Sequence, residues 1–250
     1  MKFTDTHAHI FNEYFKDFGK VIEDAKNNSV YKIINAATSF ENIEEVLETS
    51  EKYPNIYACI GLHPEDLVKD YIKLEKYIID NLNNEKLVAI GEIGLDYYYT
   101  KENKKEQIEL FEYQLSLAEK YRLPVVVHSR EATLDTINSL KKFKVEGVMH
   151  CFSGSLETAN ILINMGFYIG VGGVMTFKNS KIDTIIKKIP LDRIILETDS
   201  PYLTPEPFRK YSNEPKYIKT IAEYLANLKN ISLEEVSKVT ERNVRDLYNI

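Results

Sequence analysis

Residues 124–150, PVVVHSREATLDTINSLKKFKVEGVMH, contain the pattern that decides the fold. Two short apolar runs, residues 124–127 and 147–149, are separated by a longer amphipathic stretch. Each run ends directly before a histidine, His128 in the first case and His150 in the second. Continuous apolar runs of this length are typical of parallel strands that are covered on both faces. We therefore interpret the segment as two strands joined by a helix, with a histidine after each strand.

The same alternation extends through the whole chain. Strand-like runs occupy residues 2–5, 32–35, 56–60, 87–90, 124–127, 147–149, 167–171 and 194–196. Helical patterns lie between them. Two further helices are expected at residues 214–228 and 232–248, and Ser232 with Glu235 forms a capping-box pattern for the second. Eight such units predict an α/β fold, a (β/α)8 TIM barrel with extra C-terminal helices, as one domain of residues 1–250. An open doubly wound sheet is the rival architecture, and the count of eight favours a closed barrel.

The composition restricts the class of protein. Of the 250 residues, 44% are hydrophobic and 28% are charged, which is typical of a soluble globular protein. Neither a secretory signal nor a membrane span is expected, because Asp5 precedes any apolar run and no run is long enough to cross a bilayer. Cys59 and Cys151 form no CxxC pattern, which favours a reducing, cytoplasmic location. The net charge of −6 argues against a broad basic face that wraps nucleic acid, but not against a nuclease that uses cations locally.

All five histidines follow strand-like runs: His7, His9, His63, His128 and His150. The carboxyl ends of barrel strands meet at one face, where TIM-barrel active sites lie. A single histidine is more often structural, but five at such positions are hard to explain in that way. His7 and His9 are two residues apart on an extended chain, so their imidazoles point to the same side and can bind one cation. His128 and His150 can each bind a metal through one ring nitrogen while a neighbouring acceptor holds the other.

Two carboxylates are candidates for the same site. Glu92 comes just after the apolar run at residues 87–90, where an unpaired carboxylate would be costly. Its two oxygens could bridge two metals about 3.5–4 Å apart. Asp199 lies just after the last run and could bind a metal and orient the attacking water. A salt bridge at the barrel rim, for instance to Arg130, is the alternative for Glu92 and for Asp96, and we favour that alternative for Asp96.

Other residues are candidates for contact with the substrate. His63 either binds substrate or shapes its loop. Arg130 and Arg209 are candidates for binding a phosphate or carboxylate, with surface ion pairs as the alternative. Cys151 is interpreted as a packing residue rather than a nucleophile. The tyrosines at 97–99 are expected to line the pocket, and stacking of a base on them is a weaker hypothesis.

Together these motifs resemble the TatD family of metal-dependent deoxyribonucleases, which are amidohydrolase-like barrels. The matching segments are residues 4–9 (TDTHAH), 61–64 (GLHP), 91–98 (GEIGLDYY), 128–132 (HSREA), 150–154 (HCFSG), 197–203 (ETDSPYL) and 213–215 (NEP). They occur in order over essentially the whole chain. The resemblance implies that the metal ligands are His7, His9, Glu92, His128, His150 and Asp199. It also implies two divalent cations (Mg²⁺, Zn²⁺ or Mn²⁺) and cleavage of phosphodiester bonds in DNA with 3'–5' exonuclease character.

The expected mechanism uses a water molecule activated by two metals. The first metal is expected to bind to His7, His9 and Glu92, close to Asp199. The second is expected to bind to Glu92, His128 and His150. Asp199 would orient the water or take its proton as the water attacks phosphorus, and Arg130 or Arg209 would hold the neighbouring phosphate.

One departure from the family pattern affects the expected substrate. The family often carries Arg-Gly-Lys-Arg before Asn-Glu-Pro, whereas residues 209–212 of this chain are RKYS. The loss of two basic positions weakens the expected grip on a phosphate backbone. The alternative function is hydrolysis of an aminoacyl-tRNA ester, or of another carboxylic ester or amide, at the same metal site. A non-catalytic metal-binding protein is less favoured, because six ligands shared by two metals leave coordination positions open. We expect DNA or another nucleic acid to be bound locally, and we expect no membrane and no obligate protein partner.

Overall fold

The computed structural model describes all 250 residues and is built around eight parallel strands that pair in sequence order. The strands are β1 (Phe3–Ala8), β2 (Val30–Ala36), β3 (Ile56–Ile60), β4 (Leu87–Asp96), β5 (Val125–Arg130), β6 (Gly147–Met149), β7 (Tyr168–Val171) and β8 (Ile194–Leu196). The gap between β8 and β1 is bridged beyond the end of β8, where Ala8 pairs in parallel with Ser200. The predicted TIM barrel is therefore confirmed as a single domain, and this sequential strand order excludes the doubly wound sheet.

Several strands are longer than the apolar runs that predicted them. The expected strand at 87–90 continues through Glu92 to the end of β4, and β5 continues through His128. The two strands stay paired over this extension, from Ile93 opposite Val127 onward. The polar side chains of the extension, Glu92 and His128, contact each other inside the barrel. The pairing of β4 with β5 therefore continues past the point where the apolar residues end. Glu92 and His128 thus lie inside strands and not after them, which corrects the expected boundaries.

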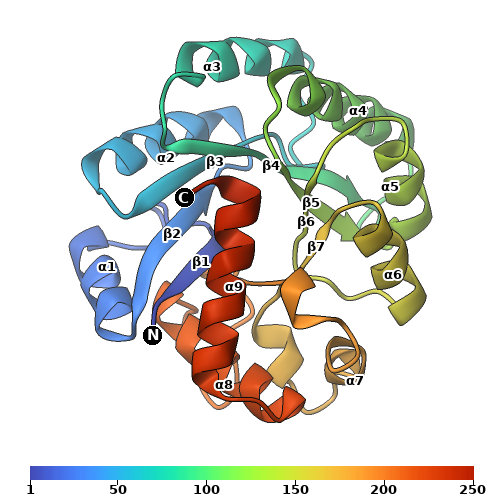
Figure 1. The fold of residues 1–250 in the computed structure, drawn as a ribbon. Helices are drawn as coiled ribbons and strands as arrows, with labels where there is room; N and C mark the ends of the chain where they lie inside the picture. Colours follow the sequence, from blue (N-terminus) through green and yellow to red (C-terminus); the bar gives the residue numbers. More distant parts are fainter.

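The helices form a ring around the barrel (Figure 1). They are α1 (Phe18–Asn27), α2 (Phe40–Lys52), α3 (Leu74–Asn81), α4 (Lys104–Tyr121), α5 (Thr133–Leu140), α6 (Leu156–Asn164), α7 (Ile182–Ile186) and α8 (Ile218–Lys229). Short 3-10 turns occupy η1 (Tyr71–Lys73), η2 (Gly173–Thr176), η3 (Leu191–Arg193) and η4 (Pro215–Tyr217). None of these helices combines the length and apolar character that a bilayer-spanning segment requires.

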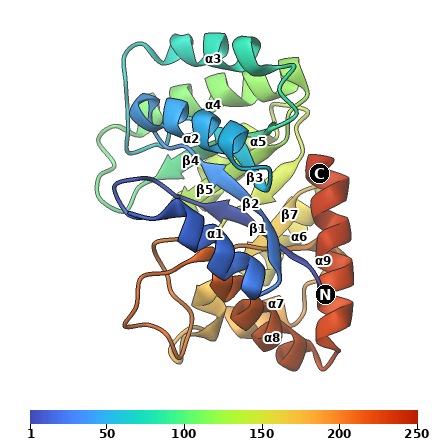
Figure 2. The same ribbon diagram turned by 90° about the vertical axis from the view of Figure 1, so that its left-hand side faces the viewer.

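Both helices expected near the C-terminus are present, but the first of them completes the ring as its eighth helix, so only the second is extra to the (β/α)8 pattern. The helix expected at 214–228 begins with the 3-10 turn η4, and α8 follows it. The second is α9 (Leu233–Tyr248), and the Ser232 side chain caps it by accepting from the Glu235 amide at 3.1 Å. Helix α9 runs across one end of the barrel, and the loops that follow the strands lie at the opposite end (Figures 1 and 2).

Apolar side chains fill two separate regions. Alternate residues of a strand face opposite sides, so Ile33 packs toward the helices and Ile34 faces the barrel interior. The interior group includes Cys59 and Val126, and α9 covers it with Val244 and Leu247. Burial of each of these two side chains contributes roughly 1.5–3 kcal/mol. Because α9 closes the barrel at this end, polar side chains can occupy the interior only toward the other end.

Candidate metal centre

The five histidines converge at the barrel end that α9 leaves uncovered. A cavity of about 530 Å³ opens there, and its walls include His9, His63, His128 and His150. His7 projects from β1 beneath this cavity and is fully buried. The structure therefore brings together residues that are up to 143 positions apart in the sequence (150 − 7) at one point of the barrel. Glu92 and Asp199 line the same cavity.

Glu92 lies at the centre of this group, and its two oxygens face different histidines. Oε2 lies 3.3 Å from Nε2 of His7 and 3.4 Å from Nε2 of His9. Oε1 lies 2.9 Å from Nδ1 of His128 and 3.8 Å from Nε2 of His150. A carboxylate in this position can contribute one oxygen to each of two neighbouring sites.

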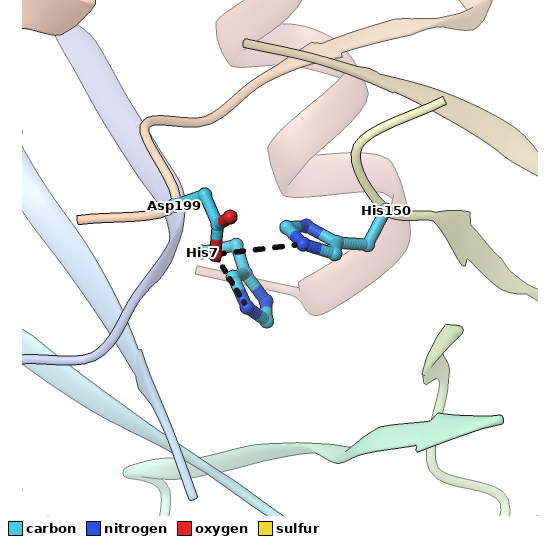
Figure 3. A group of neighbouring side chains, drawn as sticks. All are labelled: His7, His150 and Asp199. Carbon is cyan, nitrogen blue, oxygen red and sulfur yellow. Dashed lines mark ion pairs between the residues drawn. The ribbon is translucent and has the colours of Figure 1, made fainter. Parts of the chain in front are cut away.

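Asp199 closes the group on the side of β1 and β8. Its Oδ1 lies 3.5 Å from Nε2 of His9, 3.6 Å from Nε2 of His150 and 3.8 Å from Nε2 of His7. Figure 3 shows Asp199 between His7 and His150, with the three side chains coming from separate segments of the barrel wall. Nε2 of His7 and Nε2 of His9 are only 3.0 Å apart. Three imidazole nitrogens and two carboxylates thus surround one small volume.

Backbone contacts hold this first group in place. The amide of Asp199 donates to the carbonyl of His7 at 2.9 Å, and Nδ1 of His9 lies 2.9 Å from the carbonyl oxygen of Ala36. Asp199 itself has a φ of 61°, in the left-handed region. The buried carboxylate of Asp5 stabilises this turn, because it accepts from both the amide and the hydroxyl of Thr198, at 2.9 and 2.5 Å.

His128 is held between two carboxylates. Its Nδ1 faces Glu92, and its Nε2 lies 2.9 Å from Oδ2 of Asp96. The rim salt bridge that we favoured for Asp96 is therefore wrong: the residue is buried, and it orients His128. The ring of His63 packs edge-on against that of His128, with centroids 4.5 Å apart, and its Nε2 lies 3.7 Å from Oε1 of Glu92. His63 is therefore near enough to Glu92 to be a further ligand as well as a substrate contact.

Glu197 occupies the corresponding position beneath His150, and sequence reasoning missed it. Its Oε2 lies 3.1 Å from Nδ1 of His150, and its Oε1 accepts from the amide of Cys151 at 2.5 Å. Gly170 on β7 leaves the space for this carboxylate, because a Cβ there would lie 2.6 Å from Oε2. The available signal was an acid directly after the apolar run of β8, the same signal that identified Glu92.

The charges of the group oppose the effect of burial. Burial would raise the pKa of Glu92, but His150 and His7 outweigh it and hold that pKa well below the usual range. Burial would lower the pKa of His9, but Asp199 and Glu92 raise it to about 10. Burial, only partly offset by Glu92, lowers the pKa of His63 to about 4. Ionised carboxylates in a buried site require positive charge nearby, which protons on histidine or bound cations can supply.

The donor set fits divalent cations. Imidazole nitrogens and carboxylate oxygens are the ligands that Zn²⁺ and Mn²⁺ accept, and carboxylates suit Mg²⁺. Two groups have their ligand atoms within 4.8 Å of one another and share Glu92: one consists of His7, His9 and Glu92, the other of His63, Glu92 and His128. A third group of this kind consists of His7, His150 and Asp199. The residues present are therefore sufficient to hold more than one cation.

The predicted substrate contacts separate into two kinds. Arg130 lines the cavity, and its guanidinium lies over the ring of Tyr98, 3.6 Å from the centroid. Arg209 is not among the lining residues; it donates to the carbonyl of Thr204 at 3.0 Å and lies over the ring of Phe177. Cys151 is half-buried in the cavity wall.

Comparison with known proteins identifies relatives over the full length of the chain. The family model described as TatD related DNase matches residues 4–249. The uncharacterized metal-dependent hydrolase YabD of Bacillus subtilis is 43% identical, with 98% of each chain covered. The uncharacterized metal-dependent hydrolase YcfH of Escherichia coli is 35% identical over 100% of this chain and 97% of its own. The crystal structure of YjjV, a TatD homolog from Escherichia coli, superposes with a TM-score of 0.92 at 34% identity, covering 99% of this chain and 98% of its own.

Proposed function

This chain belongs to the TatD-related DNase family and is a metal-dependent hydrolase, and from that premise we propose that it cleaves phosphodiester bonds of DNA as a 3'–5' exonuclease with two divalent cations. The observation that carries this proposal is the position of Glu92, whose two oxygens face separate groups of histidines. Two cations that share one carboxylate are typical of enzymes that displace a group at phosphorus.

The assignment of ligands follows the direction of each Glu92 oxygen. His7, His9 and Asp199 with Oε2 would hold one cation. His128 and His150 with Oε1 would hold the second, with His63 as a near neighbour. When bound, divalent cations lower the pKa of a water molecule and neutralise charge on phosphate oxygens. Mg²⁺, Zn²⁺ and Mn²⁺ are the candidates, because the set mixes imidazole and carboxylate.

The side chains of the cavity then have distinct roles. Burial would raise the pKa of Asp199, but His150 and a hydrogen bond with His9 outweigh it, so the carboxylate is ionised at neutral pH. In our proposal this carboxylate orients the attacking water and accepts its proton. Arg130 holds the neighbouring phosphate, and the ring of Tyr98 packs against its guanidinium and helps to position it. With a net charge of −6, the enzyme would engage its nucleic acid at this cavity and not over a broad surface.

The alternative function rests on the position of Arg209. Arg209 is bound to Thr204 and Phe177, which leaves Arg130 as the single arginine or lysine among the residues that line the cavity. A cavity with a single arginine and no lysine can contact few phosphates, which favours a substrate whose scissile bond is not a phosphodiester. Hydrolysis of an aminoacyl-tRNA ester, or of another carboxylic ester or amide, would use the same cations to polarise a carbonyl group.

A paired assay tests these two functions. Purified enzyme is treated with a chelator and then supplied with Mg²⁺, Mn²⁺ or Zn²⁺, with single-stranded DNA in one arm and an aminoacyl-tRNA in the other. We expect release of nucleotides from the 3' end, lost in His128→Ala and Asp199→Asn. Asp192→Asn is the matched control, because Asp192 is exposed and precedes β8 at the opposite end of the barrel. Ester cleavage with intact DNA would replace the proposed substrate by the alternative one, and no cleavage in either arm would refute both.

A further inference from the structure

Half of the exposed tyrosines lie at the cavity. Six tyrosines have substantially exposed side chains: Tyr14, Tyr31, Tyr98, Tyr99, Tyr202 and Tyr211. Three of the six line the cavity, namely Tyr14, Tyr99 and Tyr202. Packing within the core does not account for these rings, because their exposure ranges from 40% for Tyr14 to 72% for Tyr99. A ligand that enters the cavity would meet their faces or edges.

Tyr14 and Tyr202 form a continuous aromatic wall that begins at the metal centre. Tyr202 lies in the loop after β8, and its ring centroid is 6.3 Å from that of His9. The hydroxyl of Tyr202 donates to that of Tyr14 at 3.0 Å, and their ring centroids are 6.0 Å apart. Phe11 supports Tyr14 from beneath, at 6.0 Å between centroids, and is itself buried. The aromatic wall therefore begins beside His9, a proposed metal ligand, and continues through Tyr202 to Tyr14.

The opposite wall of the mouth has a different chemistry. Tyr99 follows β4 and Arg130 ends β5, and these strands lie across the barrel from β1 and β8. Arg130 carries a positive charge and stacks on Tyr98. A phosphodiester at the metal centre would thus have the guanidinium of Arg130 on one side and the aromatic wall of Tyr14 and Tyr202 on the other. A nucleotide presents this combination, with a charged phosphate beside an apolar ring.

We infer that Tyr202, held in position by Tyr14, is a stacking site for the unpaired nucleobase of the 3'-terminal nucleotide, the one that cleavage releases. The inference rests on the proposed function, because it places the scissile phosphate at the metal centre. Every nucleobase has a π-face that stacks on an aromatic ring, so the site accepts all four bases. A base inside a duplex is already stacked and paired, and must leave the helix before it can reach this wall.

The probe is a pair of single-stranded thymidine oligonucleotides that differ only at the 3' end, where one carries thymine and the other an abasic residue. The readout is the ratio of kcat/KM for release of the terminal nucleotide from the two substrates. We expect the enzyme to prefer the thymine end by about five- to 150-fold, which corresponds to about 1–3 kcal/mol at 1.4 kcal/mol per tenfold. The same pair with phosphorothioate linkages gives the ratio of Kd values without cleavage.

The variants separate stacking from other effects of substitution. In Tyr202→Leu we expect the ratio to fall toward one, because leucine has no π-face. Tyr202→Phe keeps the ring and loses only the hydrogen bond with Tyr14, so most of the preference should remain. Tyr31→Leu is the matched control: Tyr31 is 40% exposed, like Tyr14, but lies at the start of β2, at the α9 end of the barrel. The ratio compares two substrates of the same variant, so a smaller folded fraction does not change it. Tyr14→Leu provides a second test, because it removes the side chain that holds Tyr202 in position, and we expect it to lower the ratio as well.

Each outcome bears on the inference separately from the proposed function. Cleavage with equal rates on both oligonucleotides would overturn the stacking site and leave the nuclease in place. A preference that persists in Tyr202→Leu would also overturn it. Base-dependent binding without cleavage, lost in Tyr202→Leu, would support the stacking site and refute the proposed nuclease. Failure to bind either oligonucleotide would overturn both.

Discussion

Glu197→Gln changes one oxygen of a fully buried side chain into an NH₂ group and leaves its size unchanged. In the structure Oε1 accepts from the amide of Cys151, and Oε2 lies 3.1 Å from Nδ1 of His150. The carboxylate therefore favours a hydrogen on Nδ1, which leaves Nε2 free to face Glu92 and Asp199. Glutamine can satisfy Cys151 only with its amide oxygen, so its NH₂ group would face Nδ1. His150 would then carry its hydrogen on Nε2 and could not bind a metal there.

The magnitude follows from the number of contacts that change. One histidine of the proposed metal centre loses its orienting partner, while Glu92, His128 and Asp199 keep theirs. Loss of such a partner typically lowers metal affinity about 10- to 100-fold, which is about 1.4–2.8 kcal/mol at 1.4 kcal/mol per tenfold. The assay is a competition titration of Zn²⁺ and of Mn²⁺ against a chelator, with far-UV circular dichroism to check the fold.

The control for this substitution is Glu85→Gln, an exposed glutamate between α3 and β4 at the far end of the barrel. We expect Glu85→Gln to bind metal like the unmodified protein, and Glu197→Gln to bind at least one cation more weakly. If Glu197→Gln retained full metal affinity while correctly folded, Glu197 would not position His150, and the tautomer argument would be refuted.

Four further predictions concern metal binding and stability. Gly170→Ala should weaken metal binding about 10- to 100-fold as Glu197→Gln does, because the new Cβ would lie 2.6 Å from Oε2 of Glu197; unchanged affinity in the chelator titration would contradict this. Addition of Mn²⁺ or Zn²⁺ at about 100 times Kd should stabilise the fold by about 2.7 kcal/mol and raise Tm by roughly 5–10 °C, reversed by a chelator; an unchanged Tm would argue against cation binding. Lys229→Met should lower the free energy of unfolding in urea by about 1–2 kcal/mol, because the ammonium of Lys229 donates to three carbonyls at the end of α7; Lys219→Met on the same helix is the control. Burial raises the pKa of Glu241, so its protonated form stabilises the fold at low pH and this contribution is lost as pH rises through the folded pKa; Glu241→Gln should therefore be more stable than the unmodified protein at pH 7 and equal to it near pH 3.

The barrel and the candidate ligands were predictable because their signals are local. Each ligand lies within or just after an apolar strand, and the TIM barrel brings all strand ends to one face. The spacing of His7 and His9 also predicts that both imidazoles point the same way, as their Nε2 atoms do. The lengths of β4 and β5 were underestimated, since the strands continue through Glu92 and His128 wherever polar side chains find partners inside the barrel.

The supporting carboxylates were not predictable in the same way. Asp5 acts through Thr198, which is 193 positions away, and Glu197 acts through His150, which is 47 positions away (197 − 150). Asp96 was assigned to a salt bridge at the rim, for instance to Arg130, whereas in the structure it faces His128, 32 positions further along the chain. These roles depend on which strand interiors face one another, and a single sequence does not contain that information directly.

The metal ligands and the substrate contacts lie on elements of different kinds. Glu92 and His128 project from strands that are paired on both sides, so the barrel fixes their direction. Tyr202 and Arg209 lie on the loop after β8, where a few substitutions can redirect a side chain. Arg209 is an example of such a redirected side chain. Its guanidinium donates to the carbonyl of Thr204 and lies over the ring of Phe177, outside the cavity, although all six candidate metal ligands are present. Chains with the same six candidate ligands can therefore hydrolyse different substrates, and the dependence of cleavage on the terminal base tests the substrate of this enzyme more directly than substitution of any ligand.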